Sequence, residues 1–92
     1  MVEYHIYPLY KGKPLIPSVA AQREIDQLCA DLWLVKRVLE EGHDCARSRR
    51  KTNIVEKCLI RKGKEIRAVV ALVEWEDKGF WRVVHVGSTG RH

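Results

Sequence analysis

Residues 53–87 read NIVEKCLIRKGKEIRAVVALVEWEDKGFWRVVHVG, and this stretch decides the fold. It holds three runs rich in β-branched and apolar residues, 53–61, 65–75 and 80–87, which is the composition of β-strands. The segments between the runs, KGK and EDKG, are short and turn-like, and connections of that length join antiparallel neighbours. The stretch therefore predicts a three-stranded antiparallel meander.

The middle run, 65–75, carries apolar residues on both of its alternating faces, which is typical of a strand that is covered on both sides. A helix can cover only one of these faces. We therefore expect one side of the sheet to pack against a helix and the other to stay partly apolar, with Arg67 on its rim.

A helix is predicted between Ser18 and Gly42. Ser18 directly follows Pro17 and is a good N-cap, and Gly42 supplies a stop. Between them, apolar residues recur at helical spacing: Ala21, Ile25, Leu28, Leu32, Val35 and Leu39. The pattern predicts one helix over about 18–41, and a break at Asp31, itself a plausible N-cap, is the alternative, which would give a helical hairpin.

The residues before this helix are expected to add little to the sheet. Residues 2–9 alternate loosely and predict a short edge strand, limited to an edge by Pro8, and KGKPLIPS (11–18) reads as a loop.

Ninety-two residues are enough for one core. The predicted fold is a single α+β domain over 1–92, in which an N-terminal helix or helical hairpin packs on a three- to four-stranded antiparallel β-meander.

Three apolar residues of the helix, Trp33, Leu34 and Val38, fall outside its apolar stripe. Either another part of the chain or a partner must cover them. With little chain left over, a partner protein is favoured, and a homodimer is its simplest form.

Positive charge is concentrated in residues 47–67. This segment holds nine lysines and arginines against two acidic residues, a net +7, whereas the other 71 residues sum to −2. A basic segment on a slightly acidic body favours a surface that faces a polyanion, and a solvated, lysine-rich hairpin is the simpler alternative.

Three cysteines, Cys29, Cys45 and Cys58, form an odd set without regular spacing, which argues against a disulfide framework and for a reducing compartment. No apolar run approaches the roughly 20 residues that span a bilayer, and the N-terminus lacks the features of a signal peptide. We therefore expect a cytoplasmic protein that does not enter the membrane.

Most catalytic motifs are missing from the sequence. There is no GxSxG, no CxxC and no glycine-rich phosphate loop. His43 and Cys45 form the only close pair of metal-ligating residues, and a zinc site usually needs a second pair. The sequence predicts neither a metal site nor a cofactor.

What remains is a set of residues able to handle a phosphodiester. Arginines can hold the phosphate while a histidine moves a proton near neutral pH. His85 is the candidate proton carrier, with Arg82 beside it and Arg61 and Arg67 on the preceding strands; packing of His85 within the strand is the simpler alternative. The candidate nucleic-acid-binding residues are Arg47, Arg49, Arg50, Lys51 and Lys57.

The helix end VLEEG, the central strand RAVVALV and the last strand RVVHVGSTGR together resemble the BrnT-like branch of the RelE-type ribonuclease toxins and a related family of small uncharacterised domains. The resemblance covers residues 25–91. It implies a small basic toxin that cuts RNA without a metal and is silenced by an antitoxin-like protein. The matching positions are Arg61, Arg67 and Arg82 with the tail 88–91.

Two functions follow as hypotheses. The first is a small RNA-interacting domain that acts as a metal-independent endoribonuclease. The alternative is a non-catalytic protein-interaction module or homodimer, in which Leu34 and Val38 meet a partner.

Overall fold

The computed structural model describes residues 7–45 and 52–90. The chain begins with a hairpin of strands β1 (Leu9–Tyr10) and β2 (Lys13–Pro17), followed by helices α1 (Val19–Gln27) and α2 (Leu32–Glu41). A short strand β3 (His43–Asp44) precedes the meander of β4 (Ile54–Arg61), β5 (Lys64–Trp75) and β6 (Lys78–Gly90).

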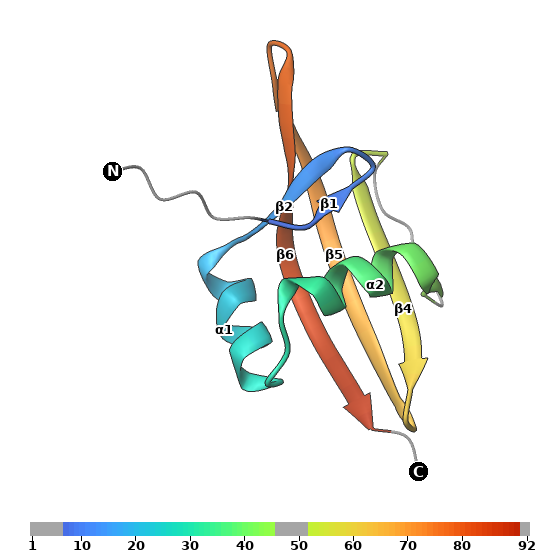
Figure 1. The fold of residues 1–92 in the computed structure, drawn as a ribbon. Helices are drawn as coiled ribbons and strands as arrows, with labels where there is room; N and C mark the ends of the chain where they lie inside the picture. The colour runs from blue at the N-terminus through green and yellow to red at the C-terminus, as the bar shows by residue number, and fades with distance from the viewer. Residues whose placement is uncertain (1–6, 46–51, 91–92) are drawn as a thin grey trace.

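The six strands of the described residues join one curled sheet, in the order β1-β2-β6-β5-β4-β3. Both helices lie on one side of this sheet (Figure 1). The β5–β6 hairpin is the longest part of the sheet, and its turn stands clear of the helices at the top of the view.

The predicted meander is present, but the predicted fold class is wrong. The sheet is mixed rather than antiparallel, because β2 runs parallel to β6, with Leu15 opposite Trp81 and Pro17 opposite Val83. Residues 13–17 had been expected to be a loop, since a strand with two prolines is unusual. Burial outweighs that preference, because the Leu15 side chain is completely buried against the helices and β6.

The N-terminal hairpin is fixed to the sheet by an aromatic pair. The Tyr10 and Trp81 rings lie 5.4 Å apart between centroids, and the Trp81 Nε1–H donates to the Tyr10 carbonyl at 2.9 Å. The edge strand predicted for 2–9 falls mostly outside the described residues, and the strand that is described begins at Leu9.

Two helices replace the single helix expected over 18–41, as the alternative with a break at Asp31 predicted. Both predicted N-caps are confirmed: the Ser18 hydroxyl accepts from the Ala21 N–H at 3.0 Å, and the Asp31 carboxylate accepts from the Leu34 N–H at 2.9 Å. Between the helices Cys29 takes a left-handed conformation, with φ of 54°, which ends α1.

The hydrophobic core lies between the helices and the sheet. Its buried side chains come from both helices and from strands β1, β2, β5 and β6. Val38 is completely buried in this core, and Leu34 packs against it half-buried. The predicted need for a partner to cover these two residues is therefore wrong, because this chain covers them itself; only Trp33, 56% exposed, stays on the surface.

The cysteines also differ from expectation. Because β3 pairs with β4 at His43 and Cys58, the next residues of the chain bring Cys45 alongside Cys58, and the two form a disulfide with their Cα atoms 5.3 Å apart. Cys29 is exposed and unpaired. Within residues 7–45 and 52–90, no helix has the length and apolar composition needed to cross a membrane.

Candidate functional site on the rear face of the sheet

The sheet has a face that points away from both helices, and we call it the rear face. Strand alternation assigns its residues: every second side chain of β4, β5 and β6 points to it, because the others are those buried against the helices. By this alternation the rear-face residues include Ile54, Glu56, Cys58 and Ile60 of β4, Glu65, Arg67, Val69, Ala71 and Val73 of β5, and Lys78, Phe80, Arg82, His85, Gly87 and Thr89 of β6. Among the described elements, neither helix covers this face (Figure 1), although the Glu24 side chain of α1 reaches its edge at His85.

A β-bulge brings Arg82 and His85 to this same face. Val70 pairs with Val83 and Val69 pairs with His85, so Val84 is an extra residue in β6. Without it, residues three apart in a strand would point to opposite faces. With the extra residue, Arg82 and His85 point to the same face. Bulges of this kind commonly re-aim a side chain beside a functional site.

Glu24 of α1 holds the His85 ring. The Glu24 Oε2 lies 3.0 Å from His85 Nδ1, while Glu24 Oε1 accepts from the Val86 backbone N–H at 2.9 Å. A carboxylate can only accept hydrogen bonds, so the hydrogen of the neutral imidazole lies on Nδ1 and the lone pair on Nε2. The ring is 47% exposed, and Nε2 is thus the atom that can take a proton from a bound molecule.

Gly87 leaves the space that this ring occupies. A side-chain Cβ at position 87 would lie 3.1 Å from His85 Nε2. Because Gly87 pairs directly with Arg67, the same contact shows that the imidazole lies on the face toward which Arg67 points.

Within the described residues, Arg67 and Arg82 are the two guanidinium groups of the rear face. The Arg67 Nε pairs with the buried Glu56 carboxylate at 3.3 Å, which fixes the side chain while leaving it 44% exposed. The Arg82 guanidinium lies over the Phe80 ring, 5.8 Å from its centroid. By strand register, the rear face therefore presents Arg67 and Arg82 on either side of a carboxylate-held histidine.

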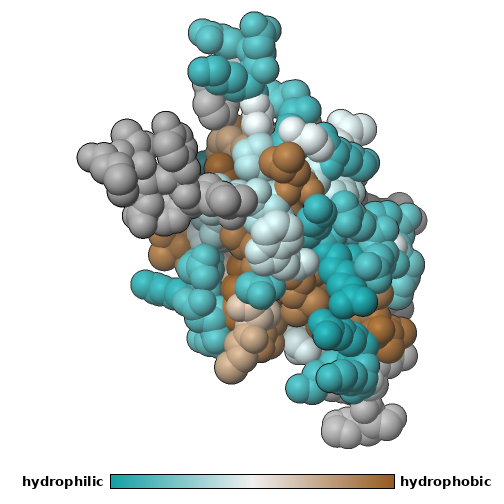
Figure 2. Space-filling model, viewed as in Figure 1, coloured by the Kyte–Doolittle hydropathy of each residue, from teal (hydrophilic) through white to brown (hydrophobic). Residues whose placement is uncertain are grey.

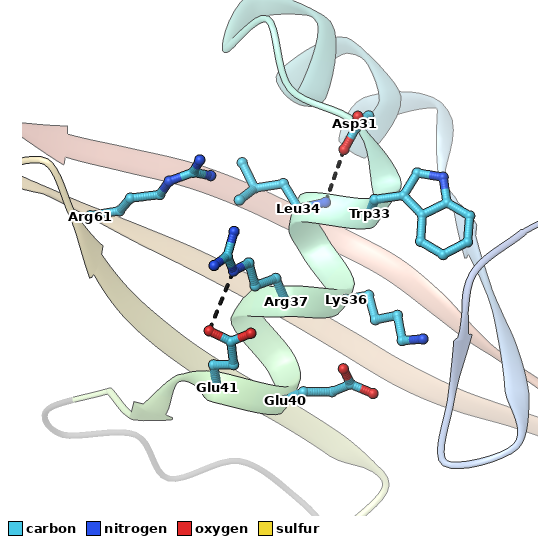
Figure 3. A pocket seen from close by; sticks show the side chains of 8 residues that line it. All are labelled: Asp31, Trp33, Leu34, Lys36, Arg37, Glu40, Glu41 and Arg61. Carbon is cyan, nitrogen blue, oxygen red and sulfur yellow. Dashed lines mark hydrogen bonds and ion pairs between the residues drawn. The ribbon is translucent and has the colours of Figure 1, made fainter.

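The remaining predicted residues do not join this group. Lys57 and Arg61 lie on one face of β4, but it is the face toward the helices. Arg61 reaches into a hollow beside α2 that is lined by Leu34, Arg37 and Glu41 among others (Figure 3). The loop residues lie outside the described part of the chain: Arg47, Arg49, Arg50 and Lys51.

Lys57 is engaged by Asp44 of β3, at 2.7 Å between Nζ and Oδ1. This hydrogen bond holds the pKa of the Asp44 carboxyl below its usual value and raises the pKa of the Lys57 ammonium. The pair joins β3 to β4 on the helix side. The described part of the basic segment 47–67 is thus divided between the two faces of the sheet, with Lys57 and Arg61 on the helix side and Arg67 on the rear face.

Sequence reasoning missed Glu24, Glu56 and Phe80. Glu24 carries no local signal, because it lies 61 residues from His85 and comes close only through the packing of α1 on β6. Phe80 could have been found from the sequence, because it lies two residues before Arg82 on the same strand and therefore points to the same face. The neighbouring aromatic residue, Trp81, is buried in the core and does not join the rear face.

In the described ranges, no three histidine, cysteine, aspartate or glutamate side chains gather in a way that could hold a metal ion.

Comparisons with protein-family models, with curated proteins and with solved structures find no significant match to this chain.

Proposed function

We propose that the rear face binds RNA and that His85 promotes its cleavage without a metal. The observation that carries this proposal is the β-bulge of β6, which gathers Arg82 and His85, with Arg67 from β5, on one face while Glu24 orients the imidazole. Two cations beside an oriented proton carrier are the groups that phosphodiester cleavage requires.

In this mechanism Arg67 and Arg82 hold the scissile phosphate and neutralise the charge that develops on its oxygens. His85 Nε2 takes the proton of the ribose 2′-hydroxyl, whose oxygen then forms a bond to phosphorus. The bond from phosphorus to the 5′-oxygen breaks, and that oxygen takes a proton from water. The products are a 2′,3′-cyclic phosphate and a 5′-hydroxyl end, and the proton held by His85 returns to solvent.

The proposal places the protein in the cytoplasm with RNA, under control of an antitoxin-like protein. Cytoplasmic reductants keep most thiols reduced, so we expect Cys45 and Cys58 to be free thiols there. The strand pairing of β3 with β4 and the ion pair between Asp44 and Lys57 would then keep β3 in place.

Binding is tested by titrating a fluorescent RNA at several salt concentrations. Each of Arg67→Ala and Arg82→Ala should weaken binding and reduce the slope of log K against log salt by roughly 0.7, the value for one phosphate contact of a single strand. Arg37→Ala is the matched control, because it removes the same charge from an exposed helix position, where Arg37 pairs with Glu41 one turn later. Equal effects of all three variants would contradict the proposal.

Cleavage is tested by incubating a long RNA with the protein in EDTA. The parent protein should produce 2′,3′-cyclic phosphate ends, and His85→Ala should lower the rate roughly 100-fold or more, as expected for loss of a general base. If His85→Ala cleaves at the parent rate, His85 is not the proton carrier.

The apolar part of the rear face favours a second candidate function, a homodimer joined through this face. Ile60 is 52% exposed on it, and the bulge residue Val84 is 38% exposed. Light scattering distinguishes this candidate: a dimer that Ile60→Glu converts to a monomer would support it, and a monomeric parent protein would remove it.

A further inference from the structure

Among the described strands, none covers one edge of β6 over the last residues of that strand. Strand β2 pairs with β6 as far as Val83, and from His85 to Gly90 the partner of β6 is β5 on its other side. Figure 1 shows this end of β6 running past α1, with no strand beside it on that side. A strand edge of this kind presents backbone N–H and C=O groups on which a further strand can pair.

The Val86 backbone shows which groups point to this edge. Its N–H donates to Glu24 Oε1 and therefore points away from β5. Alternate residues of a strand direct their backbone groups to the same side, so those of Ser88 and Gly90 also point to the edge. In the described part of the chain, no hydrogen bond is made at this edge by the Val86 carbonyl, by the Ser88 N–H and carbonyl or by the Gly90 N–H.

The side chains of this edge leave room for another strand. Prolines, charged side chains and very short strands commonly prevent edge-to-edge pairing. The outer strands of the sheet, β1 and β3, are two residues long. Residues 86–90 of β6, by contrast, read VGSTG and contain neither a proline nor a charge. A second strand can therefore approach this backbone closely.

We propose that this edge pairs antiparallel with the same edge of a second copy of the chain, about a two-fold axis at Ser88. The free groups match one another in this register. The Ser88 N–H of each copy donates to the Ser88 carbonyl of the other, and the Gly90 N–H donates to the Val86 carbonyl. The Val86 N–H needs no new partner, because Glu24 already accepts from it.

A second copy fits this edge better than a flexible peptide does. The stretch is short and offers few hydrogen bonds, and a flexible peptide must be ordered before it can make them. In a second copy, β6 is already held in place by β5. Ser88 meets Ser88 and Gly87 meets Thr89, so no like charges face each other. The helix side is less suited to a partner, because polar surface predominates over α2 (Figure 2).

This dimer differs from the rear-face homodimer considered above. Its two-fold axis is perpendicular to the sheet, so the rear faces of both copies lie on the same side and stay open. The inference is therefore compatible with the proposed RNA-binding function and does not rest on it.

Sedimentation velocity of the full chain at several concentrations measures the dimer dissociation constant, and a non-reducing gel excludes copies linked through the exposed Cys29. The parent protein should dimerise. Ser88→Pro removes one hydrogen bond from each copy while leaving the pairing with β5 intact, and it should raise the dissociation constant roughly 10- to 100-fold. Ser88→Ala keeps the N–H and should leave the constant unchanged. Thermal melts of each variant show that it is folded.

A pair of charged variants tests the position of the axis. Ser88→Lys and Ser88→Glu should each dimerise more weakly, because the axis brings like charges together, and mixing the two variants should restore a dimer. A parent protein that is monomeric at every concentration would overturn the inference. So would a dimer that Ser88→Pro and both charged variants leave intact, and if Ile60→Glu dissociates that dimer, the rear face is the interface instead.

Discussion

Glu24 and His85 are 61 residues apart in the chain, yet the Glu24 Oε2 lies 3.0 Å from His85 Nδ1. The same carboxylate accepts a hydrogen bond from the Val86 N–H through its other oxygen. Strand β2 pairs with β6 only as far as Val83, so this N–H lies on a stretch of β6 that β2 leaves unpaired. One side chain thus both accepts a hydrogen bond at the edge of the sheet and orients the imidazole, which links the packing of α1 to the position of His85.

Glu24→Gln should separate these two roles. The amide oxygen can still accept from the Val86 N–H, so the melting temperature should change little. The amide nitrogen would face His85 Nδ1 and donate to it, which moves the ring hydrogen to Nε2 and removes the lone pair needed for proton transfer. We expect the cleavage rate to fall roughly 100-fold while RNA affinity holds. Nitrogen chemical shifts of the His85 ring report the tautomer directly, and an unchanged tautomer with unchanged rate would contradict the assignment.

Gly87→Ala should raise stability and lower activity. Alanine is favoured over glycine inside a strand by about 0.5–1 kcal/mol. Its Cβ, however, would lie 3.1 Å from His85 Nε2, so the ring must shift by a few tenths of an ångström. We expect a cleavage rate lowered roughly 10-fold, since small misplacements of a reacting group are costly. Denaturant melts and cleavage assays on one preparation measure both effects, and a fully active variant would show that the ring position does not matter.

The parts of the fold that the sequence predicts are those with local signals. The meander follows from three β-rich runs with short turns, and the break between the helices follows from Asp31 as an N-cap. Strand β2 escapes prediction because its prolines argue against a strand and its parallel partner lies far away in the chain. For the site, His85, Arg82 and Arg67 are found by residue type, but their common face depends on a bulge at Val84 that no glycine or proline marks.

Gly42→Ala should destabilise the fold. A Cβ at this position would overlap the Val38 carbonyl oxygen and the Cys58 carbonyl, because the end of α2 lies directly on β4. Neither carbonyl belongs to a flexible side chain, so the backbone must move, and we expect a loss of about 1–3 kcal/mol. The control is Gly12→Ala, where nothing lies within 4 Å of the new atom and only the strain of a φ of +80° remains. Urea unfolding compares the two, and equal stability of the parent and Gly42→Ala would contradict the close approach.

Reduction of the Cys45–Cys58 disulfide should lower stability without abolishing RNA binding. The bond links residues 13 apart in sequence, and closing a loop of this size restrains the unfolded chain by about 3 kcal/mol. Melts with and without dithiothreitol measure the loss, and RNA titrations follow in the same buffers. A chain that unfolds completely on reduction would contradict the proposed cytoplasmic setting.

An NMR titration shows directly whether the rear face binds RNA, as we propose. A short single-stranded RNA is added to labelled protein while the side-chain signals of Arg67, Arg82 and His85 are followed beside the indole signal of Trp33 on the helix side. We predict that the three rear-face signals shift together with one affinity and that the Trp33 signal stays in place. Shifts confined to Trp33 and its neighbours on α2, or no shift at all, would contradict the account.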